Sequence, residues 1–209
     1  METKEIKVYK ITELEPKIRE KVVNKWMDDN SDWIHSEVTD HLIEFLGDRG
    51  VDITDRSSLQ LRWSLFSQGS GARFEFWYNV RELFLCDTPI IPLSKESRDY
   101  IETMYSETGM IGYKAHDIRN RYAYHDVKDV IIVQELYANS KEENSKYFEG
   151  YILQIVRDWY DSLCKALYKE AHTCYSSFTS EDYIINEINE NGRLFLSNGT
   201  EVTHLINEE

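Results

Sequence analysis

Apolar and polar residues alternate along the segment LQLRWSLFSQGSGARFEFWYNV at residues 59–80. Every second residue is apolar over residues 59–65 and again over residues 72–80. A period of two predicts β-strands that each bury one face. Between them, residues 67–71 contain two glycines, which adopt positive φ readily and suit a tight reversal. The pattern therefore predicts a β-hairpin at the centre of a sheet.

Helical periodicity dominates the first 50 residues. After a short predicted strand at residues 5–10, apolar residues recur every four positions over residues 18–26 and indicate a helix. We expect a second helix that begins with a cap at Ser31 or Asp32 and ends near Leu46. The buried stripe predicted for this second helix comprises Ile34, Val38, Leu42, Phe45 and Leu46.

A third helix and a second pair of strands are predicted to follow the hairpin. Ser94 is the expected cap of the helix, and its inward-facing residues are Leu93, Tyr100, Ile101, Met104 and Tyr105. Residues 110–122 and 124–136 predict two strands. Because residues 130–133 read VIIV and are apolar on both faces, we expect their strand to be central and covered on both sides.

The C-terminal third is predicted to be mainly helical. Residues 141–176 carry the longest helical pattern, with the apolar stripe Phe148, Ile152, Ile155, Trp159, Leu163 and Leu167. A shorter helix begins at Thr179-Ser180-Glu181-Asp182, with a hydroxyl cap and acidic residues in its first turn, and the Asn198-Gly199 pair predicts a small hairpin. We therefore expect one α+β domain over residues 1–209. Its antiparallel sheet is built from two hairpins with helices packed on it, and residues 141–209 form a helical part that ends in the small hairpin.

Acidic side chains are concentrated in two segments of the chain. The 209 residues carry 38 Asp and Glu against 24 Lys and Arg, a formal net charge of −14. Residues 28–55 hold nine acidic side chains and one basic, and residues 179–209 hold seven and one. Nucleic-acid backbones require basic surface, so direct nucleic-acid binding is disfavoured. Acidic surface can steer a protein toward a basic partner, or it can simply provide solubility.

Two further features bear on the compartment. No apolar run approaches the roughly 20 residues of a membrane span, and the N-terminal segment lacks the apolar stretch of a signal peptide. The three cysteines have no metal-ligand spacing, and their odd number does not suggest a disulfide framework. We expect a soluble cytoplasmic protein with reduced thiols and without membrane contact.

Carboxylates at helical spacing are the strongest candidates for a partner-binding surface. The six candidates are Glu37, Asp40, Glu44, Asp48, Glu181 and Asp182. The first four recur at spacings of three and four along one face of the second helix, and the last two lie in the first turn of the last helix. We predict that these residues meet a basic surface on a partner protein. The alternative is that they form a solvated helix face.

The sequence gives weaker signals for a catalytic or small-molecule site than for a partner-binding surface. Gln68, Arg73, Tyr124 and His125 are the candidates for a small pocket, with His125 as a possible general base. A partly buried, hydrogen-bonded histidine is the simpler interpretation, because the adjacent Asp126 would point to the opposite face of a strand. The glycine turn lacks the lysine of a phosphate-binding loop, so turn architecture is its simpler interpretation.

One arrangement of carboxylates and a histidine has the residue types of a metal site. Glu37, His41 and Glu44 can share one helix face, but three ligands from a single helix rarely close a metal site. No serine or cysteine lies in the sequence context of a known nucleophile motif. We therefore predict no catalytic residue, no metal and no cofactor.

The order of these elements resembles a family of small, uncharacterised phage and prophage proteins. Members share a glycine turn of the form S-Q-G-D-G-A-x-F, which reads SQGSGARF at residues 67–74 here. Matching segments read VYKITELEPKIREKVVNKW, SDWIHSEVTDHLIEFLG, RYAYHDVKDVIIV and FTSEDYIINEINENGRLFLSNG, so the resemblance covers nearly the whole chain. Ser70 stands where the family usually has aspartate, which favours a structural turn over an active site.

The resemblance implies a phage-encoded accessory protein that acts in the host cytoplasm. We expect it to bind and inhibit, without catalysis, a host defence protein with a basic surface, such as a CRISPR effector or another nucleic-acid-binding immune factor. One alternative is an antitoxin-like neutraliser of a toxin, a label sometimes given to members of the family. The other is a small enzyme with a site around Gln68 and His125. The sequence specifies neither the target nor the oligomeric state.

Overall fold

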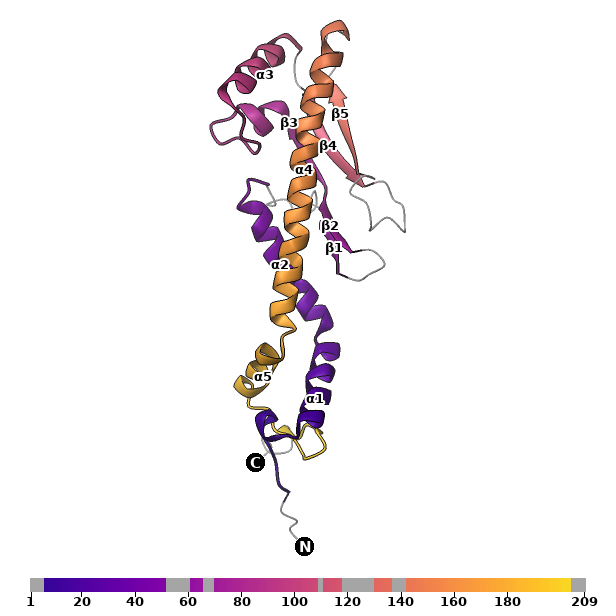
Figure 1. Ribbon diagram of the computed structural model, residues 1–209, viewed down its shortest axis with the longest axis vertical. Helices are drawn as coiled ribbons and strands as arrows, with labels where there is room; N and C mark the ends of the chain where they lie inside the picture. Colours follow the sequence, from indigo (N-terminus) through magenta and orange to yellow (C-terminus); the bar gives the residue numbers. More distant parts are fainter. Residues whose placement is uncertain are drawn as a thin grey trace. The chain divides into compact units, whose positions relative to one another are not determined.

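The computed structural model describes residues 6–51, 61–65, 70–108, 111–117, 130–136 and 142–203 (Figure 1). These ranges contain both helices and antiparallel strands, which confirms the predicted α+β class. The contacts divide the chain into two compact units, each assembled around its own buried residues. Unit 1 combines Met1–Val38 with Thr173–Glu209, and unit 2 is Thr39–His172. The helical part predicted at residues 141–209 is thus shared between the two units.

Helices form most of the described part of unit 1. The 3-10 helix η1 (Ile11–Glu13) precedes α1 (Pro16–Asp29), and α2 (Ser31–Gly47) begins in this unit. The last residues of α4 (Glu142–Phe178) and the whole of α5 (Glu181–Glu190) complete it. Its buried hydrophobic residues are Ile11, Leu14, Val22, Val23, Trp26, Ile34, Val38, Ile184, Ile188, Phe195 and Val202.

An isolated antiparallel bridge replaces the strand expected near the N-terminus. The Tyr9 amide donates to the Phe195 carbonyl at 2.8 Å, and the Phe195 amide donates to the Tyr9 carbonyl at 2.9 Å. Phe195 also forms a single bridge with Glu201, where the sequence predicts a small hairpin. The turn between them contains Gly199, whose φ is +85°. A β-carbon at this glycine would lie 3.0 Å from Ile18 Cγ2, so the turn approaches α1 closely.

The described strands of unit 2 lie in two antiparallel sheets, whereas the sequence predicts one. β1 (Leu61–Ser64) pairs with β2 (Gly71–Phe74) across the predicted glycine turn. β3 (Phe76–Asn79), β4 (Ile111–Asp117) and β5 (Val130–Leu136) form a second sheet in that order. Among the strands that the structure describes, β5 therefore lies at the edge of this sheet and not at the predicted central position. Position in a sheet depends on pairing between distant segments, which apolar character alone does not report.

Glu75 interrupts the strand that the sequence predicts over residues 72–80. β2 ends at Phe74 and β3 begins at Phe76. The alternation nevertheless continues across the break, because Ala72, Phe74, Phe76 and Val80 are all buried. The carbonyl oxygen of Phe74, immediately before the break, accepts a 2.7 Å hydrogen bond from the Tyr160 hydroxyl. A side chain from α4 thus contacts the backbone at the junction of β2 and β3.

A π-helix, η2 (Arg81–Leu85), follows β3. Asn79 and Glu82 stabilise its start reciprocally, since each side chain accepts a hydrogen bond from the other's amide at 2.9 and 2.8 Å. The next helix, α3 (Lys95–Thr108), has the predicted cap, because the Ser94 hydroxyl accepts a hydrogen bond from the Ser97 amide. Ile101 is buried as expected, whereas Tyr100 is 47% exposed, so its predicted burial was wrong.

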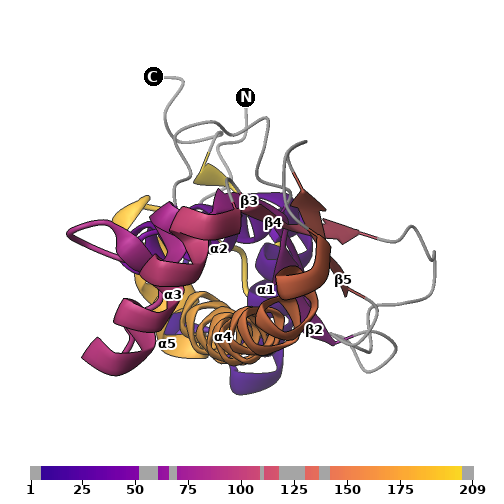
Figure 2. The same cartoon turned by 90° about the horizontal axis from the view of Figure 1, so that it is seen from above.

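The helix α4 is the longest element, as predicted, with 37 residues. Its buried residues in unit 2 are Ile152, Val156, Tyr160, Leu163, Cys164, Leu167 and Ala171. Ile155 and Trp159, which the sequence places in the stripe, are only half-buried. β3 packs on this helix, with the ring centroids of Phe76 and Trp159 5.3 Å apart. Figure 2 views α4 nearly along its axis. None of the helices in the described ranges is long and apolar enough to cross a lipid bilayer.

Candidate interaction surface

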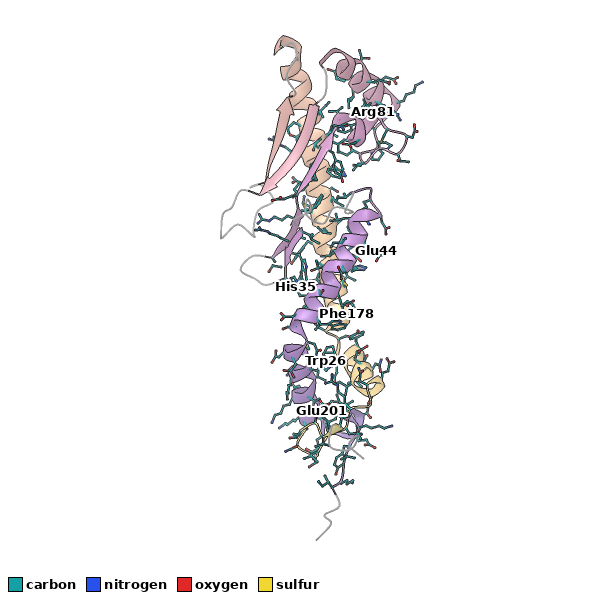
Figure 3. The ribbon with its side chains drawn as sticks, turned by 180° about the vertical axis from the view of Figure 1, so that it is seen from behind. Trp26, His35, Glu44, Arg81, Phe178 and Glu201 are labelled. Carbon is teal, nitrogen blue, oxygen red and sulfur yellow. The ribbon has the colours of Figure 1, made fainter. Side chains whose placement is uncertain are left out.

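The exposed side of α2 carries the four carboxylates that the sequence predicts, namely Glu37, Asp40, Glu44 and Asp48. Residues at a spacing of four on its other side, Ile34, Val38, Leu42 and Leu46, are buried. Phe45 is half-buried. Glu37 belongs to unit 1 and the other three carboxylates to unit 2, where Glu44 is labelled in Figure 3.

The two predicted carboxylates of α5 have local structural roles. Ser180 caps this helix as expected, because its hydroxyl accepts a hydrogen bond from the Tyr183 amide at 3.3 Å. Glu181 lies 3.4 Å from Nε of Arg19 in α1, so it has an ion-pair partner within unit 1. Asp182 is exposed in the first turn, where negative charge interacts favourably with the helix dipole. Their role in partner binding stays a prediction.

Four aromatic rings of unit 1 form a row of edge-to-face contacts. The ring centroids of Trp26 and Trp33 are 6.1 Å apart, with an interplanar angle of 82°. Trp33 also meets Phe178 at 5.8 Å, and Phe178 meets Tyr183 at 5.3 Å. Trp26 is buried, whereas Trp33 is 38% exposed (Trp26 and Phe178 are labelled in Figure 3). The row therefore reaches from the core of this unit to its surface.

Carboxylates converge on the tyrosine at one end of this row. Burial raises the pKa of Tyr183, and the charges of Glu187, Glu37 and Glu190 raise it further. Glu187 also accepts a hydrogen bond from the tyrosine hydroxyl. Both acidic segments of the sequence thus act on one hydroxyl, since Glu37 comes from α2 and the other two from α5. We define the aromatic–acidic patch as Trp33, Glu37, Tyr183, Glu187 and Glu190.

Sequence reasoning selected only one member of this patch, Glu37, as a candidate site residue. The spacing of four between Tyr183 and Glu187 is a local signal for their contact. No local signal joins Glu37 to α5, because about 150 residues of chain separate them. The proximity of Glu37 to α5 therefore follows from the fold and not from the sequence pattern.

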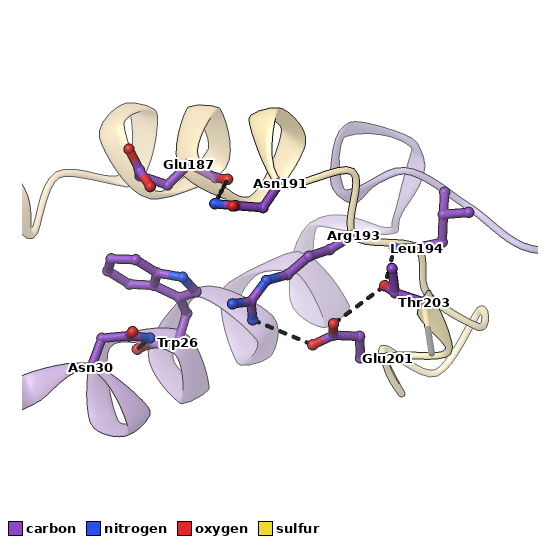
Figure 4. Close-up of polar contacts among 8 residues, drawn as sticks. All are labelled: Trp26, Asn30, Glu187, Asn191, Arg193, Leu194, Glu201 and Thr203. Carbon is purple, nitrogen blue, oxygen red and sulfur yellow. Dashed lines mark hydrogen bonds and ion pairs between the residues drawn. The ribbon is translucent and has the colours of Figure 1, made fainter. Parts of the chain in front are cut away.

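Polar contacts hold the chain that follows α5 in unit 1 (Figure 4). The Asn191 amide group donates to the Glu187 carbonyl at 2.8 Å and closes the last turn of the helix. Further along, Nη1 of Arg193 lies 3.4 Å from Oε2 of Glu201. The Thr203 hydroxyl donates to the other carboxylate oxygen of Glu201 at 3.2 Å. These contacts fix the C-terminal end of the helix that carries three members of the aromatic–acidic patch.

The small pocket predicted from the sequence can be located at one residue only. Gln68, Tyr124 and His125 lie outside the described residues. Arg73 is half-buried on β2, where it pairs across the strands with Arg62 of β1. Within the part of the chain that the structure describes, no three His, Cys, Asp or Glu side chains are grouped to hold a metal ion.

His41 contacts a residue of α4 in unit 2. Its Nε2 lies 2.8 Å from Oε1 of Glu170, and the two side chains are 43% and 34% exposed. This contact joins α2 to α4 within the unit. It gives the histidine a structural partner other than the carboxylates of its own helix.

The Cys164 thiol and the Tyr160 hydroxyl are buried in the core of unit 2. Burial is the main cause that raises the pKa of Cys164 to about 12 and raises the pKa of Tyr160. The Cys164 side chain is hydrogen-bonded to the Tyr160 hydroxyl. At neutral pH this thiol is protonated, and the thiolate is the nucleophilic form of cysteine. Cys164 therefore packs in the core of unit 2, where burial disfavours the thiolate form.

Comparison of the chain with protein-family models, with curated proteins and with solved structures gave no match. The resemblance to a phage family accordingly stays a prediction. Functional inference then depends on the geometry of the aromatic–acidic patch and the exposed carboxylates.

Proposed function

We propose that this chain is a non-enzymatic binding protein that places an acidic surface against a basic surface of another protein. The observation that carries the proposal is Trp33, a large aromatic side chain that is 38% exposed within the aromatic–acidic patch. Tryptophan is enriched among the residues that dominate binding energy at protein interfaces. Burial of the exposed part of this ring on binding would add apolar contact to the electrostatic attraction.

Electrostatics supports a basic partner. The patch combines Trp33 with three carboxylates, and the chain as a whole carries a net charge of −14. Complementary charge raises association rates and suppresses partners with surfaces of the wrong sign. In unit 2, the exposed carboxylates Asp40, Glu44 and Asp48 offer a second acidic surface.

The partner class that best fits this chemistry is a nucleic-acid-binding protein, because such proteins carry clustered basic surface. Together with the resemblance described above, this supports a phage-encoded accessory protein in the host cytoplasm. It would inhibit a host defence protein, such as a CRISPR effector, by occupying the surface that binds nucleic acid. An antitoxin-like neutraliser would use the same surface against a toxin, and the identity of the captured partner distinguishes the two.

Affinity capture from host lysate with paired charge variants tests the proposal. The patch variant carries Glu37→Lys and Glu190→Lys, and the control carries Glu96→Lys and Glu102→Lys on α3. All four carboxylates are exposed, so both variants change the net charge equally. We expect the parent and the control to retain one basic nucleic-acid-binding protein that the patch variant loses.

Salt and nucleic acid complete the experiment. Capture should weaken as the salt concentration rises, because mobile ions screen exposed charges over about 10 Å at 0.1 M. The captured protein should also lose binding to its own nucleic acid when the parent chain is added. Equal capture by the patch variant and the control, with both folded by circular dichroism, would contradict the proposal.

A further inference from the structure

We propose that the aromatic–acidic patch binds an arginine side chain from a basic segment of the partner and discriminates against lysine. This inference rests on the proposed function, since it assigns the chemistry by which the patch would recognise a basic protein. The partner is thereby specified as an arginine-bearing protein surface.

The first support is that Trp33 is held in place by its neighbours. Trp26 and Phe178 both contact its ring edge-to-face, at interplanar angles of 82° and 72°. Trp26 is itself buried at 6% exposure, so one neighbour is fixed in the core of unit 1. A ring that is already ordered loses little conformational entropy when a ligand binds to it.

The second support is the spacing of Trp33 and Glu37. They lie four residues apart in α2, and residues at this spacing are neighbours on the same helix face. An arginine guanidinium is planar, stacks on aromatic rings and forms paired hydrogen bonds with a carboxylate. A lysine ammonium is a compact, strongly hydrated charge that cannot make both contacts in this way. An indole beside a carboxylate therefore favours arginine.

The third support is the negative charge around the row. Glu37, Glu187 and Glu190 all act on the hydroxyl of Tyr183. The two arginines of unit 1 are engaged elsewhere, Arg19 with Glu181 and Arg193 with Glu201. The patch thus presents carboxylates and an exposed indole together, which suits a cation that also has a flat face.

Two peptides of equal charge, nine arginines and nine lysines, each labelled with fluorescein, test the inference. Their dissociation constants are measured by fluorescence anisotropy against the full chain in about 50 mM salt, where electrostatic contacts are weakly screened. We expect the arginine peptide to bind the parent at least about fivefold more tightly, the factor that corresponds to a cation–π contact of about 1 kcal/mol.

Variants locate this preference. Trp33→Leu should reduce the arginine-to-lysine ratio toward one, whereas Tyr100→Leu, which removes an exposed aromatic ring in unit 2, should leave it unchanged. Glu37→Gln should weaken the arginine peptide more than Glu96→Gln, which removes one exposed charge on α3. Thermal unfolding of each variant checks that the fold is retained.

Two contrary outcomes would overturn the assignment to arginine. Equal binding of the two peptides by the parent, or no measurable binding of either, would overturn the assignment to arginine. An unchanged ratio in Trp33→Leu would place any arginine preference outside the aromatic–acidic patch and would also overturn it. Either result leaves the proposed function intact if the lysate partner is still lost by the Glu37→Lys and Glu190→Lys variant.

Discussion

Both units of this chain contain an aromatic cluster. The cluster of unit 2 is closed in the sense that three of its four rings are buried and Trp159 is half-buried, whereas the row of unit 1 includes an exposed ring. In unit 2, the rings of Phe74, Phe76, Trp159 and Tyr160 contact one another at centroid distances of 5.1 to 6.3 Å. Phe74 and Tyr160 are each 1% exposed. In unit 1, the comparable row runs from Trp26 to Tyr183 and includes Trp33, which is 38% exposed. Aromatic rings thus pack against one another in both units, but the exposure of the rings to solvent differs.

The tyrosine hydroxyls show the same difference. The hydroxyl of Tyr160 donates to the Phe74 carbonyl within the core, so this polar group is satisfied by the fold itself. The hydroxyl of Tyr183 lies among carboxylates that are partly or fully exposed. A buried hydroxyl that is paired within the fold contributes to stability. A cluster with an exposed ring and nearby charge is available for recognition.

Truncation of one ring in each cluster gives the largest expected contrast. Phe74→Ala should lower the free energy of unfolding by about 3–5 kcal/mol, because it removes a fully buried ring and leaves a cavity. Trp33→Ala should cost markedly less, about 1–2 kcal/mol, since part of this ring is already in water. Urea unfolding followed by tryptophan fluorescence and circular dichroism measures both values.

The two variants should rank in the opposite order when partner binding is measured. Trp33→Ala should abolish capture of the basic partner, whereas Phe74→Ala should retain it at temperatures where the variant stays folded. Equal destabilisation by the two substitutions would show that the ring of Trp33 is a core residue of unit 1, and the contrast between the clusters would fail.

Removal of one tyrosine hydroxyl from each unit should give a smaller difference in stability than removal of a ring. Tyr160→Phe should destabilise the chain by about 1–2 kcal/mol, because it leaves the buried Phe74 carbonyl without the hydroxyl that donates to it. Tyr183→Phe should change stability by no more than about 0.5 kcal/mol, because the Glu187 carboxylate can bind water instead. Chemical denaturation at pH 7 measures the difference, and equal values would contradict the assignment of one hydroxyl to the core.

Local patterns in the sequence predicted the helices well, because caps and apolar spacing are local properties. Ser94 and Ser180 cap the helices that the sequence assigned to them. The buried side of α4 was less accurate, since both Ile155 and Val156 fit an apolar stripe and only the tertiary fold buries Val156 fully. The break at Glu75 is accompanied by the Tyr160–Phe74 hydrogen bond, whose partners lie 86 residues apart.

The candidate site was predictable in composition but not in arrangement. The acidic segments were evident from charge alone, and Glu37 was chosen from its helical spacing. Trp33 was not chosen, because an aromatic residue on a helix is more often part of the core. Its exposure became evident only once Trp26 and Phe178 were placed beside it. Tertiary packing decides which aromatic residue of an amphipathic helix remains in contact with solvent.

The smallest expected effect is an alkaline loss of stability that originates in the closed cluster of unit 2. The pKa of Cys164 is about 12 in the folded chain, against 9.0 for an unperturbed thiol. Above pH 9 the unfolded chain releases this proton while the folded chain retains it. The free energy of unfolding is therefore unaffected by Cys164 below pH 9 and falls as the pH rises from 9 toward 12. The raised pKa of Tyr160 acts in the same direction above pH 10.

Cys164→Ala isolates the thiol's share of this loss. Between pH 8 and pH 9.5, the free energy of unfolding should fall further in the parent than in the variant. The expected difference is just under 1 kcal/mol, roughly the loss that one such thiol causes half a pH unit above its ordinary pKa. Val156→Ala is the matched control, because it removes buried atoms from the same helix face without removing a titratable group, so its pH dependence should equal the parent's. Equal losses in the parent and in Cys164→Ala would mean that the thiol ionises in the folded chain. The cluster around Tyr160 would then admit solvent, and the distinction between a closed and an open aromatic cluster would no longer separate the two units.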